Sequence, residues 1–243
     1  MRKILSLLLL TCLLVPLNAL GSIEFTTATA NKVNTNYVYS GGDYTLEFWF
    51  YLTNLSQNNG LIAIDESGAA NNNRSLQVYV GTGGVIDGNQ FTNCSGATAN
   101  LTGGAALSAA TWYYARYSWN GSTASARIFN ADGTAKDSAS AAAANICSTA
   151  STKLSFARAS QNIFPLSGRI RNVWFSNVAV TSDSQSIARM FSSNPVLRGP
   201  STASHFWPFT QAGDVRDLLS RTTSTETNTP TTASDPPAIT RRY

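Results

Sequence analysis

Charged side chains are scarce in this sequence of 243 residues. Only 12% of the residues are Asp, Glu, Lys or Arg, and there is a single histidine, His205. After residue 21 the only adjacent basic residues are Arg241 and Arg242. A nucleic-acid partner is therefore not expected. With one histidine and no Gly-x-Ser-x-Gly motif, the sequence also lacks the catalytic residues that a serine hydrolase or a metal-dependent hydrolase needs.

Cysteine is nearly absent too, and one of the three cysteines lies in a segment that we expect to be removed. Arg2 and Lys3 precede an apolar run over residues 4–17, and small residues follow at 19 and 21. This pattern is typical of a secretory signal peptide over residues 1–21. The run is shorter than the roughly 20 apolar residues that a membrane-spanning helix needs, so no transmembrane anchor is expected. The sequence predicts a secreted or extracellular protein, periplasmic or at the cell surface in a bacterium.

What remains is rich in alternating strands. Residues 44–52 place Leu46, Phe48 and Phe50 on one face and aromatic and acidic residues on the other, which indicates a central strand covered on both sides. Residues 112–132 form two alternating runs joined by Asn120-Gly121. We expect a two-residue type I′ turn there.

In that register Tyr117 lies opposite Ala124, and Ala115 lies opposite Ala126. Arg116, Ser118, Ser125 and Arg127 fall on the other, wetter face.

The rest of the chain is predicted from weaker signals. Residues 181–191 read as one short helix that begins at Ser182, and residues 134–152 read as an Ala- and Ser-rich connection that contains no helix. Residues 205–209, which include His205, read as a closing strand in which the histidine is structural. Residues 221–243 have almost no core-forming side chains, so we expect a flexible tail. Residues 22–220 then form one all-β domain.

The order of these segments resembles a known family. The runs over residues 44–50, 112–117, 168–173 and 178–181, taken with the turn at 120–123, are similar to the laminin-G-like and pentraxin-like jelly rolls of the concanavalin A-like lectin/glucanase superfamily. The resemblance implies a two-sheet antiparallel β-sandwich with one short helix. It also implies binding of glycans or extracellular proteins, sometimes through calcium.

Two departures limit what the resemblance carries over. Arg171 and Asn172 stand where these domains usually have acidic residues after Gly-x-Ile, so no cofactor is expected and calcium is not supported by a motif. The Glu-x-Asp-x-x-Glu pattern of retaining glycosidases on this fold is absent, so we expect no enzyme. Four acids in loops or turns remain candidates to supply calcium oxygens or, more simply, to stabilise their own turns; they are Asp43, Asp65, Asp87 and Asp132.

The candidate ligand-binding residues are Glu47, Trp49 and Tyr51, which project from one side of the central strand. Two aromatic rings beside a carboxylate could stack on a sugar and hydrogen-bond to it. The alternative is that this face is covered by other parts of the protein. The sequence thus predicts a secreted, non-catalytic module that binds glycans or surface partners. A structural or adhesive subunit that associates with copies of itself is the second reading.

Removal of the signal peptide leaves Cys94 and Cys147, an even pair in an exported chain. We expect them to form a disulfide, and two separate thiols are the alternative. The bond would stabilise the fold by about 3–4 kcal/mol through its constraint on the unfolded chain. In the native, unreduced protein neither thiol should react with an alkylating reagent, and labelling of both would show that the bond is absent.

Overall fold

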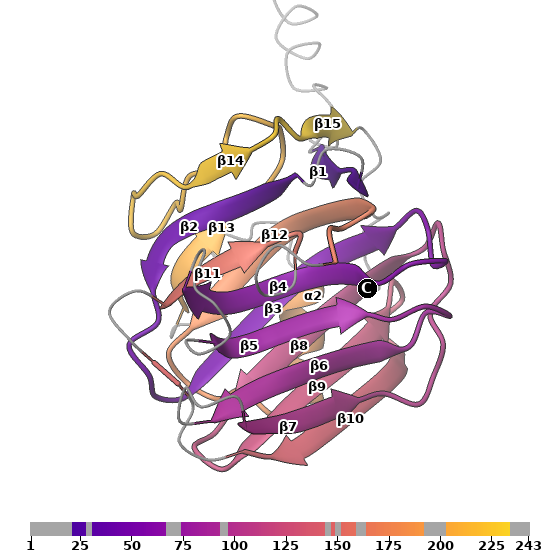
Figure 1. The fold of residues 1–243 in the computed structure, drawn as a ribbon, viewed down its shortest axis with the longest axis vertical. Coiled ribbons are helices and arrows are strands. Elements are labelled where there is room, and N and C mark those ends of the chain that lie inside the picture. The colour runs from indigo at the N-terminus through magenta and orange to yellow at the C-terminus, as the bar shows by residue number, and fades with distance from the viewer. Residues whose placement is uncertain are drawn as a thin grey trace, which may run out of the picture.

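The computed structural model describes residues 21–27, 31–66, 74–92, 97–143, 147–148, 152–158, 164–191 and 203–233. Two antiparallel sheets lie face to face, as predicted (Figure 1). Sheet A has eight strands: β10 (Ala135–Ala142), β9 (Thr123–Asn130), β8 (Trp112–Trp119), β3 (Tyr44–Leu52), β12 (Gly168–Ser176), β1 (Ser22–Phe25) and β15 (Thr231–Ala233) in that order, with β13 (Ala203–Trp207) also paired to β12.

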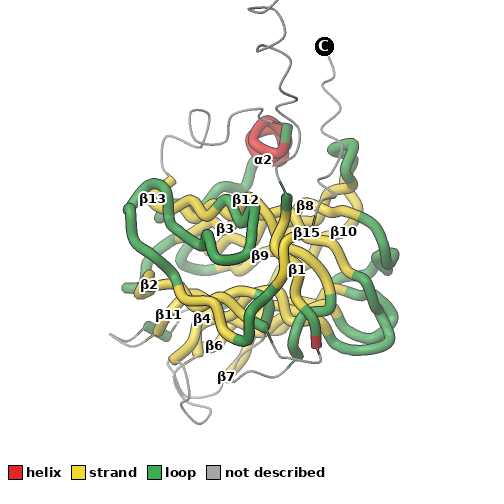
Figure 2. Tube along the Cα trace, turned by 90° about the horizontal axis from the view of Figure 1, so that it is seen from above, coloured by secondary structure: helices red, strands yellow, loops and turns green. Residues whose placement is uncertain are grey.

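Sheet B forms the other layer and has seven strands. Their order is β14 (Thr225–Thr227), β2 (Lys32–Val38), β11 (Thr152–Phe156), β4 (Asn59–Glu66), β5 (Arg74–Val80), β6 (Ile86–Thr92) and β7 (Ala97–Thr102). Helix α2 (Asp183–Met190) lies on sheet A, on the side away from sheet B (Figure 2). The molecule is therefore a β-sandwich with a single short helix among the described residues.

The core fills the space between the sheets. Leu46, Phe48 and Phe50 of β3 are fully buried and point inward, as their alternation predicts. Strand β3 pairs with β8 on one side and β12 on the other, which confirms its central position. Its outward residues Glu47 and Trp49 are also buried, because α2 covers that part of sheet A.

The turn between β8 and β9 differs from the prediction by one residue. The N–H of Asn120 donates to the carbonyl oxygen of Thr123 at 3.3 Å, so the two central residues are Gly121 and Ser122. Gly121 has φ +85°, and a positive φ at the first central position is the type II′ arrangement. The Oδ1 of Asn120 accepts hydrogen bonds from the backbone N–H groups of Ser122 and Thr123 at 3.2 and 2.8 Å. Asn120 thus stabilises the turn as the residue that precedes its two central residues.

This one-residue shift of the turn moves the strand pairing by two residues. Tyr117 lies opposite Ala126 rather than Ala124, and Ala115 lies opposite Ile128. A shift of two leaves every side chain on its predicted face, because alternate residues of a strand point to the same side. Ala124 and Ala126 are accordingly buried in the core.

Two segments that we expected to be irregular form strands. Residues 135–142, predicted as part of a connection, are strand β10, which pairs with β9 along its length. Its alternating Ala and Ser side chains give almost no contrast in size or polarity, so periodicity could not reveal it. Residues 86–92 and 97–102 also form strands, β6 and β7, which pair with each other.

The prediction of a flexible tail from residue 221 is wrong for the described residues. Strand β14 pairs with β2 and strand β15 pairs with β1, so the sandwich extends to residue 233. The amide of Asn36 also donates to the carbonyl oxygen of Thr223. These strands are held by backbone pairing at sheet edges, where side chains need not enter the core, so a composition of Thr, Ser and Pro did not reveal them.

The two faces of β9 can be compared by enlarging neighbouring residues. Ala126→Phe should lower the free energy of unfolding by about 1–3 kcal/mol, because Ala126 is 2% exposed and packs between the sheets. Ser125→Phe should cost much less, since Ser125 faces outward. Urea unfolding of both variants measures the difference, and a larger loss for Ser125→Phe would reverse the assignment of the faces.

Candidate functional site

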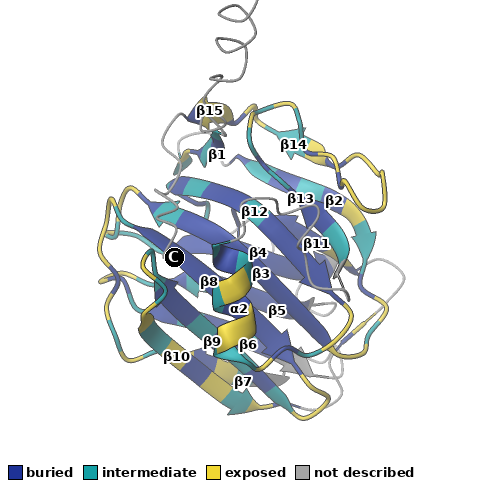
Figure 3. Cartoon of the chain, turned by 180° about the vertical axis from the view of Figure 1, so that it is seen from behind, coloured by how far each residue is buried: buried dark blue, intermediate teal, exposed yellow. Residues whose placement is uncertain are grey.

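Helix α2 meets the outer face of sheet A over strands β3, β8 and β9 (Figure 3). It begins after Ser182, as predicted, although the side chain of Ser182 makes no capping hydrogen bond to the helix backbone. Met190 is buried against Trp49, Tyr114 and Phe129 of the sheet. The aromatic part of the outer face is thus a second, smaller core, with α2 as its cover.

Glu47 is the anchor of this helix. Its carboxylate accepts hydrogen bonds from the Oγ of Ser186 at 2.5 Å and from the Nη2 of Arg189 at 2.8 Å, and the Nε of Arg189 also donates to it. Glu47 is 1% exposed and the side chain of Arg189 is 8% exposed. Burial alone would lower the pKa of Arg189, but the hydrogen bonds and charge of Glu47 raise it above its ordinary value.

Trp49 and Tyr51 lie on the same face as Glu47, as the alternation predicts. Trp49 is 2% exposed and packs edge-on against Tyr114 at 5.3 Å between ring centroids. Tyr51 is half-buried, with Trp112 at 5.4 Å and the guanidinium of Arg169 over its ring at 5.0 Å. Glu47 and Trp49 are therefore covered by other parts of the protein, whereas Tyr51 stays partly exposed. The role of these three residues in ligand binding remains a prediction.

A row of cations continues outward from Glu47 across the sheet. On neighbouring strands, Arg116 of β8 lies opposite Glu47 of β3 on one side and opposite Arg127 of β9 on the other. Ser138 of β10 lies opposite Arg127. The carboxylate of Asp183, the first residue of α2, lies between the two arginines. Its Oδ1 is 3.0 Å from the Nη2 of Arg116, and its Oδ2 is 2.9 Å from the Nη2 of Arg127.

A pocket of about 250 Å³ opens beside this row, between β8, β9, β10 and the start of α2. Arg116, Arg127, Asp183 and the hydroxyl-bearing residues Ser125, Ser138 and Ser140 contribute to its lining. Arg116 is 5% exposed, whereas about a third of the Asp183 side chain reaches solvent. The site combines cations at its inner end with hydroxyls along β10, and we take it as the candidate binding site.

Arg171 is a buried cation of a different kind. It is 2% exposed, and its Nε and Nη1 make no hydrogen bond within the part of the chain that the structure describes. Burial lowers its pKa to about 10. Among the described residues, two of its three nitrogens thus lack an acceptor, so the cost of removing this guanidinium from water is incompletely offset there.

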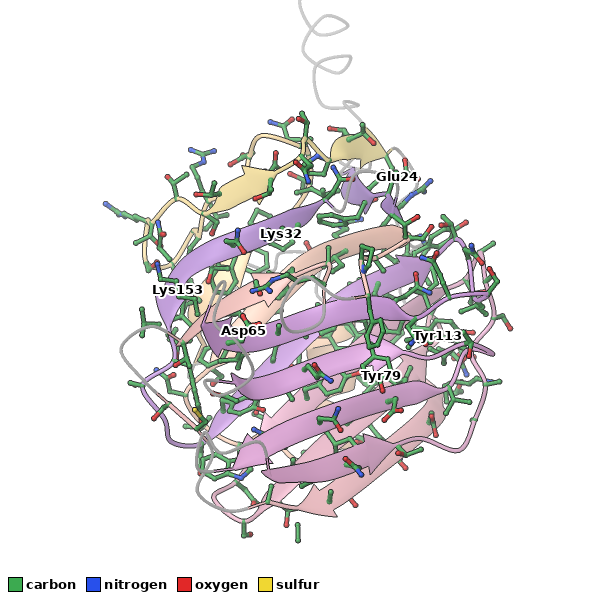
Figure 4. All side chains as sticks on the ribbon, viewed as in Figure 1. Glu24, Lys32, Asp65, Tyr79, Tyr113 and Lys153 are labelled. Carbon is green, nitrogen blue, oxygen red and sulfur yellow. The ribbon has the colours of Figure 1, made fainter. Side chains whose placement is uncertain are left out.

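The four acids considered as calcium ligands serve other contacts or lie apart. Asp65, which Figure 4 shows on β4, is buried and paired with Arg158 at 2.6 Å. Asp87 accepts from the hydroxyl of Tyr79 at 2.9 Å, and Asp132 accepts from the backbone N–H of Thr134 in a turn. Asp43 is exposed. Within the described residues no three Asp, Glu, His or Cys side chains gather as a metal site.

His205 lies in β13 and contacts the fully buried Asp217 through its Nδ1. Although burial would raise the pKa of Asp217, hydrogen bonds from His205, Ser220 and the backbone of Phe206 lower it to about 2. The ring of His205 stacks on Trp207 at 5.4 Å. The structural role expected for this histidine fits these contacts.

The remaining sequence predictions concern residues that the structure does not describe. Residues 1–20 of the expected signal peptide and Cys94 lie outside the described residues, whereas Cys147 is buried. The disulfide therefore stays a prediction. No helix in the described part of the chain is long and apolar enough to cross a membrane.

Sequence reasoning placed Arg116, Ser125 and Arg127 together on the wetter face of the hairpin but did not identify a site. It missed Asp183 and strand β10, which complete the pocket. Two arginines opposite each other on neighbouring strands repel, so such a pairing indicates that an anion lies nearby. The signal became specific only with the correct register, in which Arg116 faces Arg127.

Fold and site together define a lectin-like jelly-roll sandwich. The chain belongs to the concanavalin A-like lectin/glucanases superfamily, whose family model matches residues 25–184. A search of curated proteins by sequence finds no match. Because this superfamily includes both lectins and glucanases, membership alone does not decide between binding and hydrolysis.

Solved structures support the same fold. A protein from Bacteroides ovatus described as carbohydrate-binding aligns with a TM-score of 0.65 and 14% identity, over 93% of this chain and 63% of its own. A heptameric pentraxin from Limulus polyphemus aligns with a TM-score of 0.56 and 11% identity, over 90% of this chain and 97% of its own. The LG1–3 region of the laminin α2 chain aligns with a TM-score of 0.52 and 14% identity, over 67% of this chain and 32% of its own. This chain thus spans less than two thirds of the Bacteroides protein and about a third of the laminin region.

The anchoring role of Glu47 can be tested by its removal. Glu47→Ala should lower the free energy of unfolding by about 3–5 kcal/mol, because Arg189 is left buried without its carboxylate. Glu24→Ala is the matched control on the same sheet. It removes a partly exposed ion pair with Arg169, with 3.4 Å between the charged atoms, and should cost less than about 1 kcal/mol. Equal losses in urea unfolding would contradict this role.

Proposed function

We propose that this chain is an exported, non-catalytic module that binds glycans or surface partners. The observation that carries the proposal is the pocket beside α2, where guanidinium and hydroxyl groups converge on a solvent-open site of a lectin-like fold. Sugars present many hydroxyls, and fixed donors and acceptors of this kind recognise them by hydrogen bonds. The likeness to the Bacteroides protein described as carbohydrate-binding agrees with this reading.

The carboxylates near the candidate site favour binding over hydrolysis. Glycoside hydrolysis by the common mechanisms needs two carboxyl groups that flank the scissile bond. Glu47 and Asp183 are each held by arginines, and Glu47 is buried beneath α2. Glu47 does not line the pocket, and Asp183 is the one carboxylate among the described residues that do, so we propose that the chain binds without turnover.

Export rests on the signal peptide expected over residues 1–21. A structural or adhesive subunit that associates with its own copies is the alternative function. The Limulus pentraxin, which is heptameric, has the same fold, so self-association is compatible with this architecture.

A glycan array with the purified chain, run in calcium and again in chelator, tests the proposal. We expect binding to a defined set of glycans, no loss of binding in chelator, and no release of shortened products from the bound glycans. Sedimentation at the same concentrations reports self-association. Assembly without any glycan binding would favour the structural subunit, and product release would show an enzyme.

A further inference from the structure

The charges around the pocket do not balance. Within the described residues, three guanidinium groups, from Arg116, Arg127 and Arg189, gather with two carboxylates, from Glu47 and Asp183. Arg189 forms an ion pair with Glu47, and the other two arginines share the carboxylate of Asp183. This cluster therefore carries one positive charge in excess at the inner end of an open pocket.

The donors of Arg116 are also incompletely used. Its Nη1 donates to the Oγ of Ser186 and its Nη2 to Asp183, each at 3.0 Å. Its Nε is buried and makes no hydrogen bond with any residue that the structure describes. An unused donor on a side chain that is 5% exposed is costly unless an acceptor reaches it. Together with the excess charge, it points to an acceptor that is an anion.

The way Asp183 is held shows what kind of anion fits. Its two oxygens are divided between two guanidiniums, one from each neighbouring strand. A planar or tetrahedral oxyanion of similar size, such as a carboxylate or a sulfate, can use the same donors. Asp183 is 37% exposed at the first residue of a helix and lies at the lining of the pocket, so an incoming anion can share or replace its contacts.

The rest of the pocket suits a sugar that carries the anion. Ser138 and Ser140 are exposed on β10, next to Arg127 and Ser125 in the strand pairing. A volume of about 250 Å³ is below the range typical of drug-sized ligands, so it suits a single residue of a glycan. The hydroxyls of Ser138 and Ser140 lie where they can bond to the hydroxyls of that residue.

We propose that this pocket binds the acidic residue of a glycan, with Arg116 and Arg127 holding its carboxylate or sulfate. The inference rests on the proposed function and specifies its ligand class. Asp183 competes with the ligand for the two arginines and thereby sets the affinity.

The test uses an array of neutral, uronate-containing, sialylated and sulfated oligosaccharides, followed by titration of the best acidic one. Arg127→Gln should weaken its binding about 10-fold, the value of one charged hydrogen-bonding partner. Asp183→Asn should strengthen binding by a comparable factor, because it removes the negative charge that competes with the ligand for both arginines. Arg216→Gln, at an exposed arginine paired with Asp214 elsewhere, is the matched control and should bind like the unmodified chain. Circular dichroism checks that each variant is folded.

The outcomes separate this inference from the proposed function. Opposite changes in Arg127→Gln and Asp183→Asn, with or without a preference between carboxylated and sulfated glycans, support it. Unchanged affinity of either folded variant for the acidic glycan would overturn it, as would binding of neutral glycans alone, while leaving the glycan-binding function in place. Failure to bind any glycan would overturn both.

Discussion

The pairing of Glu47 with Arg189 holds together the part of the molecule from which its function is argued. The outer face of sheet A carries Trp49, Tyr114 and Phe129, a set of rings that would be costly to leave in water. Helix α2 covers them, but an eight-residue helix has little stability of its own. An ion pair formed at defined atoms fixes where this helix lies along the sheet, which nonspecific apolar contact cannot do. Its position in turn brings Asp183 between Arg116 and Arg127.

Much of the scaffold could be predicted from the sequence because large side chains alternate along it. Strand β3 and the faces of the β8–β9 hairpin followed from aromatic and aliphatic residues at every second position. The position of the turn did not, because Asn-Gly supports both a turn centred on the pair and one shifted by a residue. Strands β10, β14 and β15 were missed because small and hydroxyl-bearing residues carry no such contrast, and backbone pairing with a neighbour holds them in place.

The candidate site was less accessible from sequence for a related reason. Glu47 was singled out for its charge in an aromatic strand, and this residue is important, but its partner Arg189 lies 142 residues away in the chain. Whether such a carboxylate faces a ligand or a helix depends on a contact that local pattern cannot reveal. The pocket requires three strands in register and one helix end. Arg171 shows the converse, since its position in the sequence gave no sign that its guanidinium would be buried with two nitrogens that make no hydrogen bond to the described residues.

The first and last strands have a consequence for how the molecule is assembled. Strands β1 and β2 follow each other in sequence but belong to opposite sheets, and β15 and β14 pair with them in turn. Each sheet therefore joins segments that lie far apart in the chain. Pairings between such distant segments form slowly, because a long loop must close before any contact is gained. Until residues 225–233 pair with them, β1 and β2 each form one edge of their sheets, and the three-residue strands β15 and β14 then take their place. Because a short edge strand offers fewer free backbone groups than the seven-residue β2, the late pairing of β14 protects sheet B from pairing with other chains.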